Sequence, residues 1–343
     1  MYNVLIKWLA LIGLTFFITA CSKTAPQLLH IQGQTMGTYY QVKYVLDAKQ
    51  QSNMQLSAQA LQIEIDKRLE LVNNQMSTYR PDSELSRFNK VGKSMTVSDA
   101  VRDVVDASLS LFKQSNGAFD VTVGPLVNLW GFGPDKRPEK VPPQALINAK
   151  MQIVGSQYLS VDGNRLIKSI PDLYLDLSSI AKGYGVDFIA EYLQQLGISN
   201  YLVDIGGELR VQGLKPEKEQ WTLAIERPVA GQNVQRVIHI GDNAIATSGD
   251  YRNYFESDGI RYSHTIDPKT GKPISHKLVS VTVINKSCML ADGYATAITV
   301  LGPEAGLLFA KKHHLPVFLL VKEGDDFSEY YTSEFEPYFL KDK

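Results

Sequence analysis

The chain has 343 residues, enough for one large domain or two modest ones at ~100–200 residues per domain. Hydrophobic residues make up 44% and charged residues 21%, a globular composition that argues against a disordered, fibrous or polytopic membrane protein. Because 35 Lys and Arg stand against 36 Asp and Glu, there is no domain-wide basic field, and we expect no nucleic-acid partner.

The first twenty residues predict an export signal. Residues 1–20 carry one charge, Lys7, and the run from Trp8 to Ala20 is almost wholly apolar. This run is shorter than the ~20 residues of a transmembrane helix, and a short basic start before an apolar core is typical of a secretory signal peptide. The alternative is an N-terminal membrane anchor.

The end of this run resembles a bacterial lipobox, Ile18-Thr19-Ala20-Cys21. We therefore expect cleavage before Cys21 and lipid on its thiol, which would hold the protein on a bilayer through residues 21–32 as a tether. Cys288 then has no partner, and we expect it to be a buried small apolar residue.

The mature chain begins with strand-like and helix-like patterns. Residues 33–46 alternate and are rich in Tyr, Val and Thr, which predicts a strand. Residues 57–76 place apolar side chains three and four apart, which predicts an amphipathic helix. A second helix is expected to start at Ser98 and to end at Asn116-Gly117.

The rest of the chain predicts a mixed fold. Residues 133–143 are rich in Pro and charge and are interpreted as an exposed loop within one domain, with a domain boundary as the alternative. Helices are expected at 181–196, from Asp292 and from Pro303, and strands at 172–176, 201–205, 221–226, 237–240, 279–284 and 317–321. This pattern predicts an α+β fold, with residues 33–343 as a single domain.

Common catalytic motifs are absent. No GxGxxG and no GxxxxGK[ST] occurs, so neither a Rossmann dinucleotide fold nor a P-loop is supported. There is also no HExxH, CxxC or GxSxG. His313-His314 falls near a predicted helix end, where a solvated terminus is a simpler interpretation than a metal site.

Several polar clusters nevertheless suggest a phosphate and cation site. The run from Asp176 to Tyr184 leads from a predicted strand into a helix N-terminus, which offers backbone N–H groups to an anion. Asp292 and Thr296 are four apart, so their oxygens would share one helix face. Mg²⁺ is held by one or two carboxylates plus phosphates and water, which suits this pair, although Asp292 is equally compatible with an N-cap.

Seven motifs occur in a specific order along the chain: QTMGT at 34–38, MSTY at 76–79, GAFD at 117–120, SSIAKGY at 178–184, SGDY at 248–251, HTIDPKTG at 264–271 and ADGYAT at 291–296. Together they resemble the ApbE family of periplasmic lipoproteins, which are FAD:protein FMN transferases. The resemblance implies an ApbE-like fold of mixed, largely antiparallel sheets flanked by helices.

The resemblance also implies a reaction and a location. FAD is cleaved at its pyrophosphate, FMN is joined by a phosphoester to a threonine of a target protein, and AMP leaves. Targets in the family are membrane redox subunits, such as those of the sodium-pumping NADH:quinone reductase, with an acceptor sequence similar to D-x-x-(S/T)-G-A-(S/T). We therefore expect a lipid-anchored protein on the periplasmic face of the inner membrane.

Residue roles are implied by the same motifs. The FAD site would be lined by Met36, Tyr79, Ala118, Phe119, Asp120, Ser178, Tyr184 and Ile266, with Lys182 offering further positive charge. The carbonyl of Ala181 and the side chains of Asp292 and Thr296 would hold Mg²⁺. His264 would be the general base that takes the proton of the acceptor hydroxyl. Asp267 would orient His264 or only shape its loop, and Asp250 is a lesser candidate for substrate contact.

Two other functions remain open at this stage. A Mg²⁺-dependent FAD pyrophosphatase would use water in place of the threonine, and a non-catalytic lipoprotein would only store or deliver flavin. Tyr79 favours the transferase, because some family members with a different residue at this position hydrolyse FAD instead of transferring FMN.

Overall fold

The computed structural model describes residues 25–47, 50, 57–134, 140–229, 233–249, 254–257 and 259–340. The expected signal peptide (residues 1–20), the lipidated Cys21 and Asp250 lie outside the described residues. Within the described ranges, no helix has the length and apolar character needed to cross a membrane.

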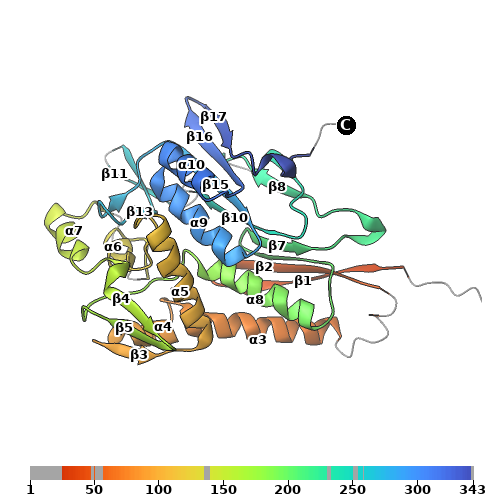
Figure 1. The fold of residues 1–343 in the computed structure, drawn as a ribbon, viewed down its shortest axis with the longest axis horizontal. Helices are drawn as coiled ribbons and strands as arrows, with labels where there is room; N and C mark the ends of the chain where they lie inside the picture. Colours follow the sequence, from red (N-terminus) through yellow and green to blue (C-terminus); the bar gives the residue numbers. More distant parts are fainter. Residues whose placement is uncertain are drawn as a thin grey trace, which may run out of the picture.

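An eight-stranded sheet forms the centre of the fold (Figure 1), and its neighbouring strands follow the order of the sequence. Its strands are β1 Gln27–Thr35, β2 Thr38–Leu46, β6 Tyr201–Ile205, β7 Glu208–Gln212, β10 Ala244–Gly249, β15 Leu278–Asn285, β16 Val317–Glu323 and β17 Asp326–Tyr331. All pairings between strands of the described residues are antiparallel, and the predicted α+β class is confirmed.

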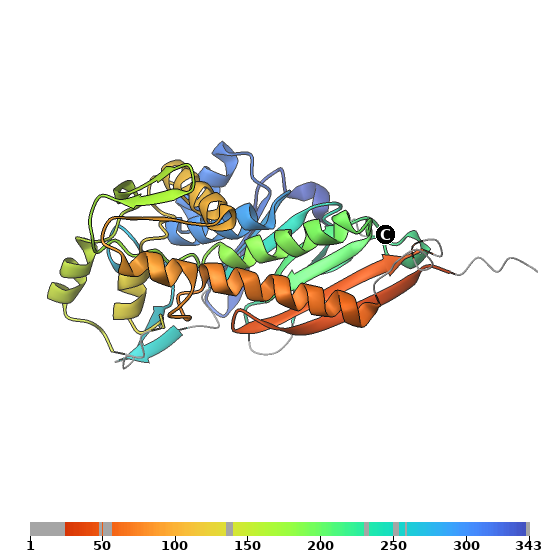
Figure 2. The same ribbon diagram turned by 90° about the horizontal axis from the view of Figure 1, so that it is seen from below.

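Helices cover one face of this sheet. They are α3 Ala58–Met76, α8 Ala181–Gln195, α9 Cys288–Leu301 and α10 Pro303–Lys312. Figure 2 shows α3 and α8 running side by side along the sheet. Successive strand residues point to opposite faces, so Val203 and Ile205 pack under the helices whereas Leu202 packs on the other face. That other face is covered by β8 Leu223–Glu226, β9 Val234–Ile238 and the C-terminal turn η3 Glu336–Tyr338.

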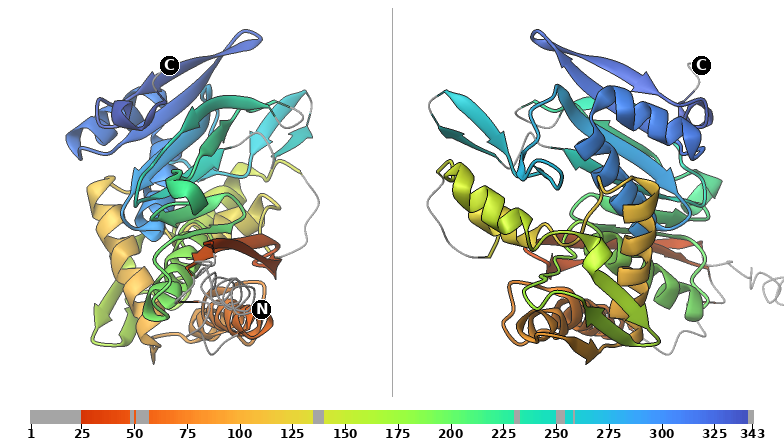
Figure 3. Two further views of the ribbon diagram at one scale, coloured as in Figure 1. Left: turned by 90° about the vertical axis from the view of Figure 1, so that its right-hand side faces the viewer. Right: turned by 60° about the vertical axis from the view of Figure 1, so that its left-hand side comes forward.

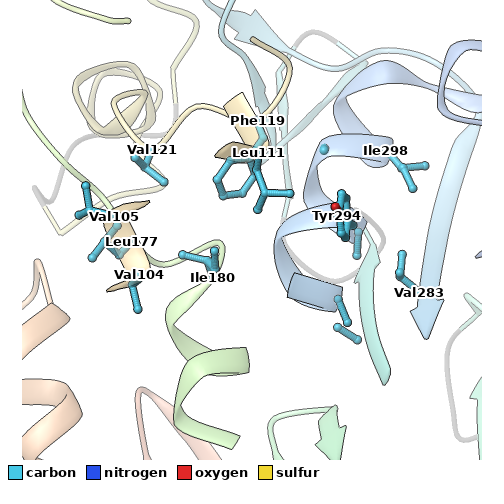
Figure 4. Packing of buried hydrophobic residues seen from close by; sticks show 14 of the residues in the cluster. Val104, Val105, Leu111, Phe119, Val121, Leu177, Ile180, Val283, Tyr294 and Ile298 are labelled. Carbon is cyan, nitrogen blue, oxygen red and sulfur yellow. The ribbon is translucent and has the colours of Figure 1, made fainter. Parts of the chain in front are cut away.

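The segment between β2 and β6 contributes α3 and α8 and builds a second lobe. The lobe contains α4 Glu84–Lys90, α5 Asp99–Gln114, α6 Gly124–Leu129, α7 Gln144–Met151, the turn η1 Ser156–Tyr158, and the small sheet of β3 Ser94–Thr96, β4 Leu159–Asp162 and β5 Arg165–Lys168. Leu111 and Phe119 pack against α9 in the main core (Figure 4). The core thus continues from the sheet into the lobe.

Short strands complete the fold after β7. They are β11 Tyr254–Ser257 paired with β12 Ile260–Ser263, and β13 Ile266–Asp267 paired with β14 Lys272–Pro273, and the turn η2 Pro216–Lys218 precedes β8. Figure 3 shows the β11–β12 hairpin standing out from the main sheet. A small hydrophobic cluster joins this hairpin to α6 and α7.

The helix predictions with strong periodicity are confirmed. Ser57 caps α3 and Ser98 caps α5, each accepting a hydrogen bond from a backbone N–H of the first turn. Pro303 begins α10 as expected. Cys288 is fully buried, also as expected.

The single strand predicted at 33–46 is wrong, because the structure has a hairpin there. β1 and β2 are joined by a two-residue turn at Met36-Gly37, whose φ values are 50° and 72°. The turn shifts the alternation by one residue, since Ile31 and Thr35 are buried in β1 whereas Tyr40 and Val42 are buried in β2. The predicted run held only three residues of β1, too few to show this shift. β1 begins at Gln27, so the domain starts before residue 33 and takes in part of the segment expected to be a tether.

Four further predictions are corrected. Residues 172–176 form no strand; the amide of Asn89 donates to Leu175 O at 2.8 Å and accepts from Leu175 N at 2.8 Å, in place of a neighbouring strand. Asp292 does not begin a helix, because α9 starts at Cys288 with Ser287 as its N-cap. The strands predicted at 221–226 and 237–240 are shifted, to Leu223–Glu226 and Val234–Ile238.

Candidate active site

A cavity of about 1540 Å³ lies where the sheet, α3 and the inserted lobe meet. Its lining includes twelve of the thirteen residues expected to bind FAD or Mg²⁺ or to act as base: Met36, Tyr79, Ala118, Phe119, Asp120, Ser178, Ala181, Lys182, His264, Ile266, Asp292 and Thr296. Tyr184 is not in this lining, and its ring instead stacks on Phe188, with the centroids 5.9 Å apart.

A glycine brings together the two segments that were predicted to bind the cation. Gly183 lies in the first turn of α8, where a Cβ atom would collide with the backbone carbonyl of Cys288 in α9. This close crossing lets the Gly183 N–H donate to Asp292 Oδ2 at 3.1 Å. One N–H of the α8 N-terminus, expected to serve an anion, is therefore already used by the Asp292 carboxyl.

Asp292 lies in a setting that disfavours its charge. It is 6% exposed, and burial together with the nearby Glu208 carboxyl raises its pKa to about 8, against the opposing effects of Lys182 and the Gly183 N–H. Thr296, one turn further along α9, lines the same cavity as Asp292 and Ala181. A cation at this corner would compensate the buried carboxylate.

Lys182 is paired within the protein. Its ammonium lies 2.7 Å from Glu208 Oε2, and the Glu208 side chain is 4% exposed. Burial raises the pKa of Glu208, although Lys182 opposes this rise. The sequence singled out Asp204 to Glu208 as a polar segment with paired glycines, but it gave Glu208 no role in the site.

The donor set fits magnesium better than zinc. Among the described residues, no three His, Cys, Asp or Glu side chains are grouped as a metal site of those residues would require. Ala181, Asp292 and Thr296 instead offer one carbonyl, one carboxylate and one hydroxyl, all oxygen ligands, which Mg²⁺ prefers.

The excess of acidic residues in the cavity lining also favours a bound cation. Its acidic residues are Asp66, Glu70, Asp120, Asp176, Glu208 and Asp292, and its Lys and Arg residues are Lys67, Arg80 and Lys182. Six acids against three basic residues leave the walls acidic. A dianionic pyrophosphate would be repelled here unless a bound cation reversed the local charge.

Of the three aromatic residues expected at the FAD site, the two that line the cavity differ in exposure. Tyr79 is 66% exposed, so its ring face is available to stack on a flat ligand. Phe119 is 1% exposed and packs inside the main core (Figure 4), so it supports the cavity wall from behind. Tyr79 is therefore the ring positioned for stacking.

Asp120 holds the wall of the cavity through its own loop. Its carboxylate accepts hydrogen bonds from Thr122 N at 2.8 Å, Thr122 Oγ1 at 2.6 Å and Ser156 Oγ at 2.7 Å. Asp176 acts similarly beside it, accepting from Ser178 N at 3.0 Å. Both acids line the cavity and fix the backbone around it.

His264 follows β12 and lines the cavity, with its ring edge-on to Phe132 at a centroid distance of 6.4 Å. Asp267 was expected either to orient His264 or to shape the loop. Its Oδ1 accepts from Lys269 N at 2.9 Å and its carbonyl from Gly271 N at 2.9 Å. These contacts give Asp267 the loop-shaping role.

Comparison with known proteins agrees with this geometry. The sequence profile described as "ApbE family" matches residues 36–319, most of the chain. The chain belongs to the ApbE family. The predicted family is thereby confirmed.

Relatives of this ApbE family member are similar over nearly their whole length. A FAD:protein FMN transferase of Vibrio cholerae is 52% identical, covering 98% of this chain and 99% of that protein. A FAD:protein FMN transferase of Escherichia coli K12 is 40% identical, covering 97% of each. The solved structure of flavin transferase ApbE from Vibrio cholerae has a TM-score of 0.84 and 51% identity, covering 92% of this chain and 100% of that one. The chain is thus a transferase enzyme.

One methyl group added at the α8–α9 crossing of this ApbE family member should disturb the expected cation site of Ala181, Asp292 and Thr296. In Gly183→Ala, the new methyl group meets the Cys288 carbonyl, so the helices must separate and the Gly183–Asp292 hydrogen bond weakens. We expect a loss of about 1–3 kcal/mol of unfolding free energy, as for overpacking, and weaker Mg²⁺ binding. Denaturant unfolding and calorimetry measure the two effects. Gly197→Ala, past the far end of α8, is the control for Mg²⁺ binding; its φ of +77° strains an alanine, so it should lose stability but keep Mg²⁺ affinity. An equal loss of Mg²⁺ affinity there would contradict this account.

Proposed function

We propose that this enzyme is a Mg²⁺-dependent FAD:protein FMN transferase. It would cleave FAD at the pyrophosphate, attach FMN through a phosphoester to a threonine of a target protein, and release AMP. The observation that carries the proposal is one cavity in which the oxygen donors Ala181, Asp292 and Thr296 and the base candidate His264 all take part. The names of the relatives, FAD:protein FMN transferases, support the transfer of FMN from FAD to a protein.

The cation-binding residues would act on the pyrophosphate. Ala181, Asp292 and Thr296 would hold Mg²⁺ at the α8–α9 crossing, and Lys182 stands beside them in its ion pair with Glu208. Bound there, magnesium supplies the positive charge that stabilises the pyrophosphate as electrons move onto the leaving AMP.

A residue of the chain, His264, would activate the acceptor threonine. The threonine oxygen attacks the phosphorus of the FMN half of FAD and forms the new P–O bond, while the bond from that phosphorus to the bridging oxygen breaks. The bridging oxygen leaves with AMP. The hydroxyl proton passes to an imidazole nitrogen of His264, since a threonine hydroxyl is a weak nucleophile until its proton is removed.

The acceptor and the location complete the proposal. The acceptor would carry a segment similar to D-x-x-(S/T)-G-A-(S/T) and belong to membrane redox subunits, such as those of the sodium-pumping NADH:quinone reductase. Lipid on Cys21 would anchor the enzyme to the periplasmic face of the inner membrane. These details follow from the family resemblance and from the lipobox sequence.

Mass spectrometry of an acceptor protein tests the reaction. With enzyme, FAD and Mg²⁺, we expect the acceptor mass to rise by the mass of FMN less one water, and one AMP to appear for each acceptor labelled. FMN and AMP released without acceptor labelling would indicate a pyrophosphatase instead. FAD binding with no AMP would indicate a flavin carrier, and either result overturns the proposal.

Lipid should be dispensable for the chemistry. The cavity-lining residues all lie at or after Gly33, so a protein that begins at Ser22 should fold, bind FAD and transfer FMN at the parent rate in detergent-free solution. Transfer to a purified acceptor measures this. A protein that folds and binds FAD but transfers only when lipidated would contradict the separation of anchor from catalyst.

A further inference from the structure

His264 lies at the end of a stack of aromatic rings. Its ring meets Phe132 edge-on, with an interplanar angle of 71°. Phe132 contacts Phe255 at 5.4 Å, Phe255 stacks on Tyr262 at 5.1 Å, and Tyr262 stacks on Trp130 at 5.6 Å between ring centroids. The stack joins the end of α6 to the β11–β12 hairpin that leads into His264.

Trp130 also fixes the chain on the other side of His264. Its Nε1–H donates to Gly271 O at 2.9 Å, and Gly271 N donates to the carbonyl of Asp267 at 2.9 Å. Tyr262 precedes His264 and Gly271 follows it, so Trp130 holds both flanks of the histidine. Trp130 is 2% exposed, which excludes water from these contacts.

The backbone that carries Trp130 and Phe132 is restricted in its conformation. Gly131 has a φ of +88°, and a Cβ atom at Gly133 would collide with the Asn128 side chain. Phe132 therefore leaves α6 at a set angle, and its ring lies in the cavity wall next to His264. A set backbone and a packed ring together restrict the rotation of the neighbouring imidazole.

We propose that Phe132 is a positioning residue for the transfer reaction, which orients the His264 imidazole through the ring-edge contact, with Trp130 holding the backbone on both sides. The inference rests on the proposed function. It follows from the strong dependence of proton transfer on geometry, since a misplacement of about 1 Å can cost ~10²-fold in rate. Phe132 acts through His264 and takes no proton itself.

Single-turnover transfer in Phe132→Leu tests this role. Leucine keeps an apolar side chain but removes the ring edge, so we expect the transfer rate to fall by ~10-fold or more. FAD affinity should stay within about 2-fold of the parent, and the pH at which the rate is half-maximal should not move. Phe132→Tyr keeps the ring and should restore most of the rate.

A double-mutant cycle shows whether Phe132 acts through His264. In a His264→Ala background, Phe132→Leu should cause no further loss, because the group that it positions is gone. Phe309→Leu is a matched control: Phe309 is a buried phenylalanine of α10 that is not in the cavity lining, and its variant should transfer at the parent rate.

The outcomes are separable from failure of the proposed function. If the parent labels no acceptor, the proposed function fails. If the parent transfers FMN and Phe132→Leu matches it, or if the two changes multiply in the double variant, the positioning role is wrong. A fall in FAD affinity as large as the fall in rate would assign Phe132 to FAD binding and would also overturn the role.

Discussion

Replacing Asp292 with alanine should abolish AMP release from FAD at ordinary Mg²⁺ concentrations. Asp292 is the carboxylate of the proposed oxygen set, and the cavity already has more acids than basic residues. Without a bound cation, the pyrophosphate would face an acidic wall and its leaving group would gain no stabilisation. We expect the rate to fall by at least ~10²-fold, since even outer residues of metal sites cost ~10–100-fold. Chromatography of AMP measures the loss.

Two further variants sharpen this test. Asp292→Asn keeps the side-chain volume and should lose activity equally, which separates charge from packing. Asp325→Ala removes an exposed acid in the β16–β17 turn and should behave as the parent. If Asp292→Ala still releases AMP at the parent rate, Asp292 is not a magnesium ligand.

The pH dependence of Mg²⁺ binding should also show whether Asp292 is a ligand. The pKa of Asp292 in the folded protein is raised to about 8, so Asp292 keeps its proton below that pH, whereas an ordinary Asp loses its proton near pH 4. A cation must displace this proton, so Mg²⁺ affinity should rise with pH up to about 8 and level off above it. Calorimetry in buffers of different ionisation enthalpy measures the released proton. Affinity that falls with rising pH would contradict the assignment.

Replacing His264 with alanine should slow FMN transfer by ~10²–10⁴-fold, the usual contribution of a positioned base. FAD and Mg²⁺ binding should remain close to the parent values, because the base would act on the acceptor hydroxyl. At saturating Mg²⁺, the parent rate should rise with pH, because a base must be unprotonated to accept the proton, and the variant should lose this rise. Single-turnover rates and FAD affinity measured on the same variant give both quantities.

The alternative role for His264 is to hold the turn that follows it. The turn has its own hydrogen bonds, from Lys269 N and Gly271 N to Asp267, and the Trp130 indole holds Gly271. We therefore expect His264→Ala to fold normally. A variant with weak FAD binding but normal turnover per bound FAD would end the assignment of His264 as base.

Periodicity predicted the elements that have one buried face. α3 buries Leu61, Ile65, Leu69, Val72 and Met76 on one side, which is the pattern that a sequence displays directly. α9 is buried almost all round, so its apolar residues show little period and its start at Cys288 was placed too late, at Asp292. The extended residues 172–176 were mistaken for a strand, because a side-chain amide replaces the partner that a strand requires.

The candidate site was predictable where local spacing carries the chemistry. Asp292 and Thr296 share one helix face, and their four-residue spacing shows this in the sequence. Glu208 and Phe132 were missed because their roles depend on contacts that the fold creates, Glu208 with Lys182 and Phe132 with His264. No local pattern reports which residues far apart in the chain will meet.

The insertion between β2 and β6 determines when the cavity can exist during folding. β2 pairs with β6, Tyr40 opposite Ile205, only after a loop of more than a hundred residues has closed. Tyr79 and Ser178 lie within that loop, whereas His264 and Asp292 lie after it. A partly folded chain therefore has no complete cavity, and a ligand of the cavity binds the native state alone. At a hundred times its dissociation constant, such a ligand adds about 2.7 kcal/mol to the stability of the whole domain, so substrate supply would govern how long the enzyme survives proteolysis.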